Sequence, residues 1–133
     1  MAGLVVDTHA LVWYLLGSPR LSVTARSRLD SALAAGEPLH VPAVSLIELT
    51  YLVEKGRLPA AARTRVSSLI DDPESGLVLA AIDRGVVDAV ARVDRDSVPD
   101  MPDRIIAATA LHLGLPLVTK DRKIRAAEIE TIW

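Results

Sequence analysis

The sequence predicts an α/β fold built on a parallel sheet. Short apolar segments at residues 4–6, 39–41, 77–82 and 115–118 alternate with longer segments of helical periodicity, and strands separated by helices form parallel sheets. Half of the 133 residues are hydrophobic, whereas aromatic residues make up only 3% and phenylalanine is absent. We therefore expect residues 1–133 to form one domain with an aliphatic core.

The helices of the first half are marked by their terminal residues. Thr8 is the expected N-cap of the first helix, Ser22 caps the second, which Gly36 closes, and Pro59 begins the fourth. Pro42 interrupts regular structure after the second strand. The expected helices span residues 9–16, 23–35, 45–55 and 59–70.

The second half continues the alternation of strands and helices. The segment 77–82 is an almost unbroken apolar run, which is typical of a strand covered on both faces. Residues 98–102 form a loop, after which a strongly apolar helix begins at Asp103 and ends at Gly114. The remaining expected elements are a helix at 83–93 and strands at 115–118 and 130–133. Ligands of open parallel sheets bind beyond the carboxyl ends of the strands, so we expect the functional site at that edge.

Composition excludes several classes of function. The chain has no cysteine, which excludes disulfides, zinc ribbons, iron–sulfur clusters and thiol nucleophiles. A net charge of −2 excludes indiscriminate binding to nucleic acid, so a polyanionic partner must meet a local basic patch. The N-terminus lacks the basic segment of a secretory signal, and the apolar run at 11–16 is too short to span a bilayer. We expect a soluble, cytoplasmic protein with no membrane attachment.

Acidic residues gather at the predicted carboxyl edge of the sheet. Asp7 directly follows the first strand, Asp121 closely follows the fourth, and Glu48 lies in the first turn of the helix after the second strand. Asp103 begins the helix that precedes the fourth strand. The pattern leaves its position open, because the opposite end of that strand carries it away from the edge unless the preceding loop wraps back.

Each acid also has a purely structural interpretation. Ser45 and Glu48 have the spacing of a capping box, in which the glutamate accepts from the backbone amide of the serine. Asp100 is suited to be an N-cap, Asp103 is favoured by the dipole of its helix, and Asp121 is suited to cap a final turn. In this interpretation the protein is a non-catalytic binding module.

Helical spacing points Glu48 and Asp103 inward. Glu48 shares a helical face with Tyr51 and Leu52, and Asp103 shares one with Ile106. Inward carboxylates near one another repel and are driven toward the neutral form, and a divalent cation removes that repulsion. All-oxygen ligands suit Mg²⁺ or Mn²⁺, whereas the absence of cysteine and of paired histidines disfavours zinc.

The chemistry that such a centre supports is hydrolysis. A cation held by carboxylates and water activates a water molecule and stabilises charge on a phosphoryl oxygen. The sequence has neither a G-x-x-x-x-G-K-[ST] nor a G-x-G-x-x-G motif, so it lacks the loops that hold nucleotide phosphates. Hydrolysis of a phosphodiester bond therefore fits better than phosphoryl transfer from ATP.

Four stretches of the chain resemble the PIN-domain ribonucleases, specifically the VapC-type toxins: Val5–Trp13, Val44–Leu49, Asp100–Ala110 and Leu117–Asp121. The resemblance covers nearly the whole chain, and the four stretches occur in the order of the family. The resemblance implies a three-layer α/β/α sandwich with a five-stranded parallel sheet. It also implies a Mg²⁺- or Mn²⁺-dependent endoribonuclease that is the toxin of a toxin–antitoxin pair. Together with the apolar run Leu11–Leu16, it predicts a homodimer that binds a VapB-type antitoxin across its N-terminal helices.

The same resemblance assigns roles to individual residues. It implies that Thr8 and Thr119 are small hydroxyl residues that support the site, and that Asp100 is a further acidic metal ligand. It places four residues at the catalytic, metal-binding positions, namely Asp7, Glu48, Asp103 and Asp121. It also implies that Asp103 reaches the edge that the other acids share.

A basic cluster, Lys120–Arg125, surrounds Asp121. Lys120 and Arg122 are candidates for holding an RNA phosphate beside the cation. Arg104 is a third candidate, for which a salt bridge is an equally good interpretation. A short run of charges is usually a solvated turn, and that interpretation stays open for the cluster.

A phosphoaspartyl protein, either a receiver domain or a haloacid-dehalogenase-like phosphatase, is the main alternative. The phosphatases need a second aspartate where this chain has His9. A receiver domain needs an aspartate at the end of its third strand, where Leu79, Ala80 and Ala81 stand. The residues therefore favour the ribonuclease.

Overall fold

The computed structural model describes residues 2–125, 127 and 129–133. The strands are β1 (Leu4–Val6), β2 (Leu39–Pro42), β3 (Leu77–Ala80), β4 (Leu117–Val118) and β5 (Thr131–Ile132). The helices are α1 (Thr8–Leu16), α2 (Val23–Ala34), α3 (Ala43–Glu54), α4 (Ala60–Asp71), α5 (Arg84–Val90), α6 (Met101–Leu113) and α7 (Arg122–Arg125). Within these described residues, no helix is long and apolar enough to cross a membrane.

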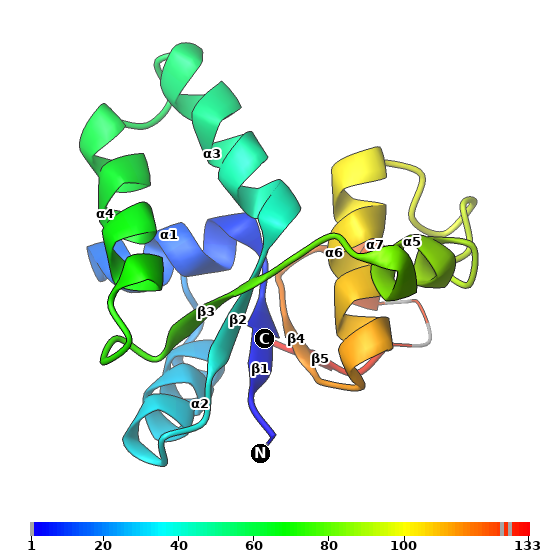
Figure 1. The fold of residues 1–133 in the computed structure, drawn as a ribbon, viewed down its shortest axis with the longest axis horizontal. Coiled ribbons are helices and arrows are strands. Elements are labelled where there is room, and N and C mark those ends of the chain that lie inside the picture. Colours follow the sequence, from blue (N-terminus) through cyan, green and yellow to red (C-terminus); the bar gives the residue numbers. More distant parts are fainter. Residues whose placement is uncertain (1, 126, 128) are drawn as a thin grey trace.

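The five strands form a parallel sheet in the order β3-β2-β1-β4-β5 (Figure 1). The chain moves outward from β1 to β3 on one side and then returns to place β4 on the other side of β1. This change of direction is a topological switch point, where open α/β sheets bind their ligands. The order differs from the 2-1-3-4-5 order of receiver domains, so the fold excludes that alternative.

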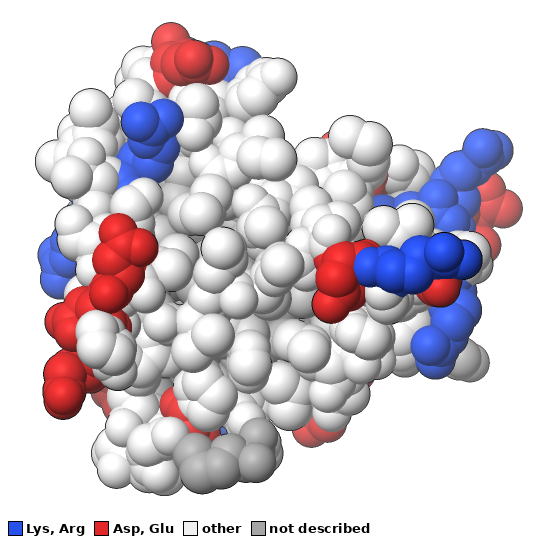
Figure 2. Space-filling view, viewed as in Figure 1, with Lys and Arg blue, Asp and Glu red and all other residues white. Residues whose placement is uncertain are grey.

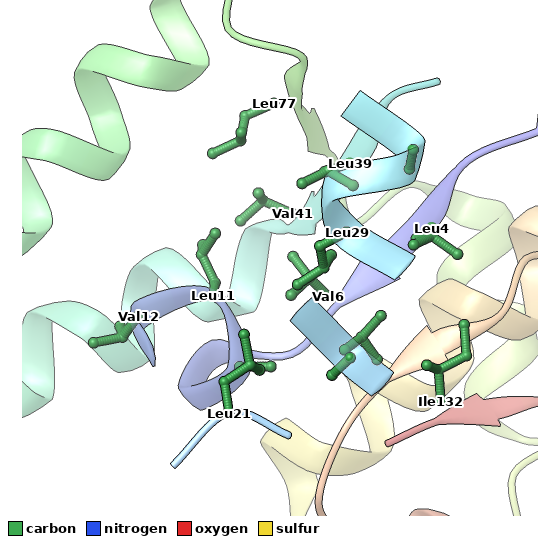
Figure 3. Packing of buried hydrophobic residues seen from close by; sticks show 14 of the residues in the cluster. Leu4, Val6, Leu11, Val12, Leu21, Leu29, Leu39, Val41, Leu77 and Ile132 are labelled. Carbon is green, nitrogen blue, oxygen red and sulfur yellow. The ribbon is translucent and has the colours of Figure 1, made fainter. Parts of the chain in front are cut away.

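Helices cover both faces of the sheet, as the sequence predicts. Leu4 and Val6 point into one apolar cluster with residues of α1, α2 and α4 (Figure 3), whereas Val5 points into a second cluster with residues of α5, α6 and α7. Helix α3 contributes Leu49 to the first cluster and Val44 to the second. The architecture is therefore a three-layer α/β/α sandwich with an aliphatic core.

The first two helices show how local chemistry sets their starts. Helix α2 is capped as predicted, because Oγ of Ser22 accepts from the amide of Ala25 at 3.0 Å. The prediction for α1 is wrong by one residue, since its N-cap is Asp7 and not Thr8. The Thr8 hydroxyl contacts other side chains, so the aspartate supplies the capping oxygen instead.

Helices α3 and α6 each begin two residues before their predicted starts. Helix α3 begins at Ala43, which places Ser45 inside the helix, so the capping box with Glu48 does not form. Helix α6 begins at Met101 and is capped by Asp100. A proline in the first turn of a helix, such as the one that follows Met101, is compatible with helical geometry.

Strand β3 also corrects a prediction. It ends at Ala80, and it is an edge strand of the sheet rather than a strand covered on both faces. Val78 and Leu79 are 44% and 41% exposed. A continuous apolar run does not distinguish an edge strand from a central one, because strand order is set by the crossovers and not by composition.

Candidate active site

Asp7 lies where β1 ends and α1 begins, at the switch point of the sheet. Its amide donates to the carbonyl of Val118 at 3.1 Å, and its Oδ1 accepts from the amide of Ala10 at 2.8 Å. Burial raises the pKa of the Asp7 carboxyl, and the charge of Asp121 adds to this effect. Hydrogen bonds from the Thr119 hydroxyl and the Ala10 amide act in the opposite direction. The fold thus holds a carboxylate where its negative charge is disfavoured.

Thr8 and Ser45 position Glu48 at the same edge. Oγ1 of Thr8 donates to Oε1 of Glu48 at 2.7 Å and shares a hydrogen bond of 2.9 Å with Oγ of Ser45. Both hydroxyl residues are buried, whereas Glu48 is half-buried. The sequence pattern gives Ser45 only a capping role and misses this contact, although its position one helical turn before Glu48 places both side chains on one face.

Thr119 links two acids across neighbouring strands. It is buried, its hydroxyl hydrogen-bonds the Asp7 carboxyl, and its Oγ1 accepts from the amide of Asp121 at 3.0 Å. Oδ1 of Asp121 accepts from the amide of Lys123 at 2.8 Å and thereby caps α7. The capping interpretation of Asp121 is therefore correct, and the cap engages only one of its two carboxylate oxygens.

The structure brings Asp103 to the other acids. A helix that connects parallel strands runs antiparallel to them, so the N-terminus of α6 lies at the carboxyl edge even though β4 begins at the opposite edge. Burial raises the pKa of Asp103 to about 7, and the charge of Asp100, a hydrogen bond and charge from Asp121, and the charge of Glu48 all act in the same direction. The negative charges of Asp100, Asp121 and Glu48 therefore all act on Asp103.

Asp100 lies beside this group, at the start of α6. It is exposed, and its Oδ2 accepts from the amide of Asp103 at 3.1 Å. The N-cap interpretation of Asp100 is correct. Its role as a metal ligand stays a prediction.

The donor set fits a hard divalent cation in its chemistry. Asp7, Glu48, Asp103 and Asp121 offer only carboxylate oxygens. Burial raises the pKa of Asp103, and the charges of Asp121 and Glu48 add to this effect. Among the described residues, no three acidic or histidine side chains are arranged closely enough to form a complete ligand cage. Mg²⁺ keeps several waters and binds proteins through one or two carboxylates. Ligation of a cation by Asp7, Glu48, Asp103 and Asp121 stays a prediction.

The basic candidates have different surroundings. Lys120 is exposed and its Nζ lies 5.7 Å from the centre of the Trp13 ring, within cation–π range. Arg122 is exposed in α7. Nε of Arg104 donates to the carbonyl of Val93 at 3.0 Å, which ties α6 to the segment after α5. Contacts of all three with RNA stay predictions.

Comparisons with known proteins agree on the family. The chain matches the family model of the PIN domain over residues 4–130. It is 30% identical over 126 residues to Ribonuclease VapC22 of Mycobacterium tuberculosis, with 95% of this chain and 92% of that protein covered. The fold resembles VapBC2 from Rickettsia felis bound to a DNA fragment from their promoter, with a TM-score of 0.72, 15% identity and 97% and 96% of the two chains covered. A toxin–antitoxin complex from Klebsiella pneumoniae gives a TM-score of 0.63 and 22% identity over 100% and 97% of the chains. The chain therefore belongs to the PIN-domain family.

Proposed function

We propose that the protein is a Mg²⁺- or Mn²⁺-dependent endoribonuclease that hydrolyses RNA phosphodiester bonds and acts as the toxin of a toxin–antitoxin pair. The observation that carries the proposal is the gathering of Asp7, Glu48, Asp103 and Asp121 at one edge of the sheet, where the charges of Asp121 and Glu48 act on Asp103. Asp7 and Asp121 also cap helices, but a capping role does not account for the positions of Glu48 and Asp103. The family membership and the relative named as a ribonuclease support the same conclusion.

The chain's own residues prepare the site for a cation. Asp7, Glu48, Asp103 and Asp121 would hold the ion, and a bound divalent cation supplies water activation and charge stabilisation at a phosphoryl oxygen. A pKa of about 7 means that Asp103 carries a proton in a large fraction of molecules at neutral pH. Asp103 would release this proton in order to hold a cation, because a ligating carboxylate must be deprotonated. Thr8 and Thr119 orient the neighbouring carboxylates.

The substrate would be held by positive charges close to the acids. Lys120 and Arg122 are exposed beside Asp121, where they would hold a phosphate of the RNA next to the cation. The net charge of −2 gives no general attraction to RNA. Contacts of this local kind would therefore position the substrate.

A protein partner follows from the related complexes. The structural neighbours include VapBC2 and a toxin–antitoxin complex, and we extend to this chain a VapB-type antitoxin as partner and a homodimeric state. Of the apolar run at residues 11–16, Leu11 and Val12 are buried in the core, whereas Leu16 is 58% exposed and Val23 at the start of α2 is 86% exposed. The partner would therefore meet the end of α1 and the start of α2.

Cleavage of single-stranded RNA by the purified protein tests the activity. We expect cleavage with Mn²⁺ or Mg²⁺, none with EDTA, and recovery when the cation is added back in excess. Co-expression with the protein encoded by the adjacent small gene tests the partner, with a stable complex and relief of growth arrest as the expected result. Cleavage that resists the chelator would contradict the metal-dependent mechanism, and cation binding without any cleavage would favour a non-catalytic binding module.

A further inference from the structure

Both tryptophans of the chain lie together at the carboxyl edge of the sheet. Trp13 belongs to α1, which begins directly after Asp7, and Trp133 directly follows β5. Their ring centres are 6.0 Å apart with an angle of 61° between the ring planes, which is an edge-to-face contact. Both side chains are half-buried and pack against the first apolar cluster. The core therefore holds the Trp13 ring in place.

Lys120 lies over this ring. Its Nζ is 5.7 Å from the centre of the Trp13 ring, within the range of a cation–π interaction. Its backbone is fixed on both sides, because Oγ1 of the preceding Thr119 accepts from the amide of the following Asp121 at 3.0 Å. The side chain itself is exposed. The ring thus holds the positive charge of a residue that adjoins Asp121, and it leaves that charge open to solvent.

His9 brings the same ring close to Asp7. The ring centres of His9 and Trp13 are 5.7 Å apart, as expected for residues one helical turn apart on α1. Burial raises the pKa of Asp7, and the charge of His9 acts in the opposite direction, so the imidazole also lies near that carboxyl. The Trp13 ring is therefore close to the acids on both its His9 side and its Lys120 side.

The face shown in Figure 2 offers no broad basic surface among its described residues. Its lysine and arginine side chains lie near α4 and α5 and at the end of α3 rather than across the middle, and the net charge is −2. A single well-placed cation therefore matters more for holding a polyanion. A free surface lysine loses rotamer freedom each time it binds a phosphate. A lysine that already rests on a ring loses less, and this preorganisation favours binding.

We propose that Trp13 is a positioning residue, which holds Lys120 beside Asp121 so that its ammonium group donates to a phosphate oxygen of the RNA. Trp133 and His9 brace the ring, and Trp13 itself touches no substrate. This inference rests on the proposed ribonuclease function and deepens it by naming the residue that places the phosphate contact. If Trp13 only filled the core, its effect on cleavage would be independent of Lys120.

A double-mutant cycle of Trp13→Leu and Lys120→Gln separates these interpretations. Cleavage of a single-stranded RNA of mixed sequence is measured with Mg²⁺ to obtain kcat and KM. We expect Trp13→Leu to raise KM about two- to fivefold, the fold-change that corresponds to an exposed cation–π contact, with kcat unchanged. Trp13→Phe keeps an aromatic ring and should stay closer to the wild type. In the Lys120→Gln background, Trp13→Leu should raise KM no further.

The salt dependence of RNA binding identifies the group that meets the phosphate. Binding of a fluorescently labelled RNA to Asp103→Asn, in which cleavage should be slow, is measured with Mg²⁺ at several salt concentrations. Lys120→Gln should weaken binding and lower the slope of log Kd against log salt by about 0.7 to 1, because one phosphate contact is lost. Trp13→Leu keeps the charge and should retain the slope. Lys123→Gln, which removes an exposed lysine of the same basic cluster, is the matched control and should weaken binding less.

Tryptophan emission tests the contact between the ring and the lysine without any reaction. In a Trp133→Phe background Trp13 is the single tryptophan of the chain. Lys120→Gln should change its emission, because a cation leaves the face of the ring, whereas Lys123→Gln should not. This measurement does not require Trp13→Leu to fold.

The outcomes distinguish this inference from the function on which it rests. A wild-type protein that neither binds nor cuts RNA overturns both. A wild-type protein that cuts RNA overturns the positioning inference alone if Trp13→Leu raises KM equally with and without Lys120, or if Lys120→Gln leaves the Trp13 emission unchanged. Unchanged RNA cleavage by Lys120→Gln, together with lost binding of the adjacent-gene protein, would assign the lysine to a protein partner and would also overturn the inference.

Discussion

Asp7 has two roles that depend on different properties of its side chain. As the N-cap of α1 it needs only a hydrogen-bond acceptor, which Oδ1 supplies to the Ala10 amide at 2.8 Å. As a proposed metal ligand it needs a negative charge. Asparagine caps helices about as well as aspartate does, so a single substitution can remove the charge and keep the cap.

We expect Asp7→Asn to be at least as stable as the wild type without metal. Burial and the Asp121 charge both raise the pKa of Asp7, so removing its charge relieves desolvation and repulsion. The same variant should lose RNA cleavage and the stabilisation by Mn²⁺, since an amide is a poorer ligand for a hard cation. Melting temperature with and without Mn²⁺, measured beside RNase activity, checks both statements.

Asp7→Ala is the matched control for this variant, because it removes the charge and the cap together. It should be less stable than Asp7→Asn by about 1 kcal/mol, the usual contribution of an N-cap. An active Asp7→Asn protein, or one that is clearly destabilised without metal, would contradict the assignment of Asp7 to the metal.

At the scale of elements, the start of α6 gives different surroundings to Asp100 and Asp103. The sequence alone does not show which of the two is more important for cleavage. Asp100 is exposed and caps the helix, whereas Asp103 is half-buried in its first turn and faces Asp121 and Glu48. The cap role leaves Asp100 at the margin of the site. Asp103 lies at its centre.

We therefore expect Asp103→Asn to lower the cleavage rate by on the order of 100-fold or more and Asp100→Asn to lower it by about tenfold or less. Asparagine preserves the cap at position 100, so circular dichroism should show unchanged helix content in both variants. The opposite ranking of the two rates would show that Asp100 is the direct ligand and Asp103 its support.

The elements also show how far a sequence can be interpreted. Apolar runs and capping residues predict all five strands, and the order of strands and helices predicts the parallel sheet, because these features depend on local composition. Exposure of β3 depends instead on strand order, which follows from crossovers between distant segments. Tyr51 illustrates the same limit, since it is 58% exposed although it shares a helical face with Glu48, and a helical face cannot be assigned to core or surface until its neighbours are known.

The residues of the site also differ in whether local sequence or contacts between distant segments set their positions. Asp7 and Asp121 follow strands, so their common edge is predictable from the chain direction. Asp103 reaches that edge because a crossover helix runs back across the sheet, which a motif resemblance implies and strand patterns alone leave open. The hydroxyl pair Thr8 and Ser45 joins residues that are 37 positions apart, and no local pattern marks such a contact.

At the scale of the whole molecule, the acids link stability to pH. Asp103 has a pKa of about 7 in the folded protein, against about 3.8 for an aspartate in an unfolded chain, so between these values the folded protein holds a proton that the unfolded chain releases. This contribution to stability is complete below the unfolded value and is lost as the pH rises through about 7. Asp7 shifts in the same direction.

We expect the metal-free protein to become less stable from pH 5 to pH 8, and Asp103→Asn to flatten that decline. Mn²⁺ should restore stability most strongly at the upper end of the range, where the cation replaces the lost proton. Chemical denaturation at several pH values, with EDTA or with Mn²⁺, measures each effect. A wild-type slope that Asp103→Asn leaves unchanged would locate the titrating group elsewhere.

The open edge of β3 affects how the whole molecule behaves in concentrated solution, because it can pair with another chain. Its outer backbone amides and carbonyls face away from β2, and the exposed side chains of Val78 and Leu79 beside them carry no charge. An apolar, uncharged strand edge is a template for pairing with another chain. We therefore expect this short segment to promote self-association at high concentration, and Leu79→Lys to reduce it without touching the acidic site.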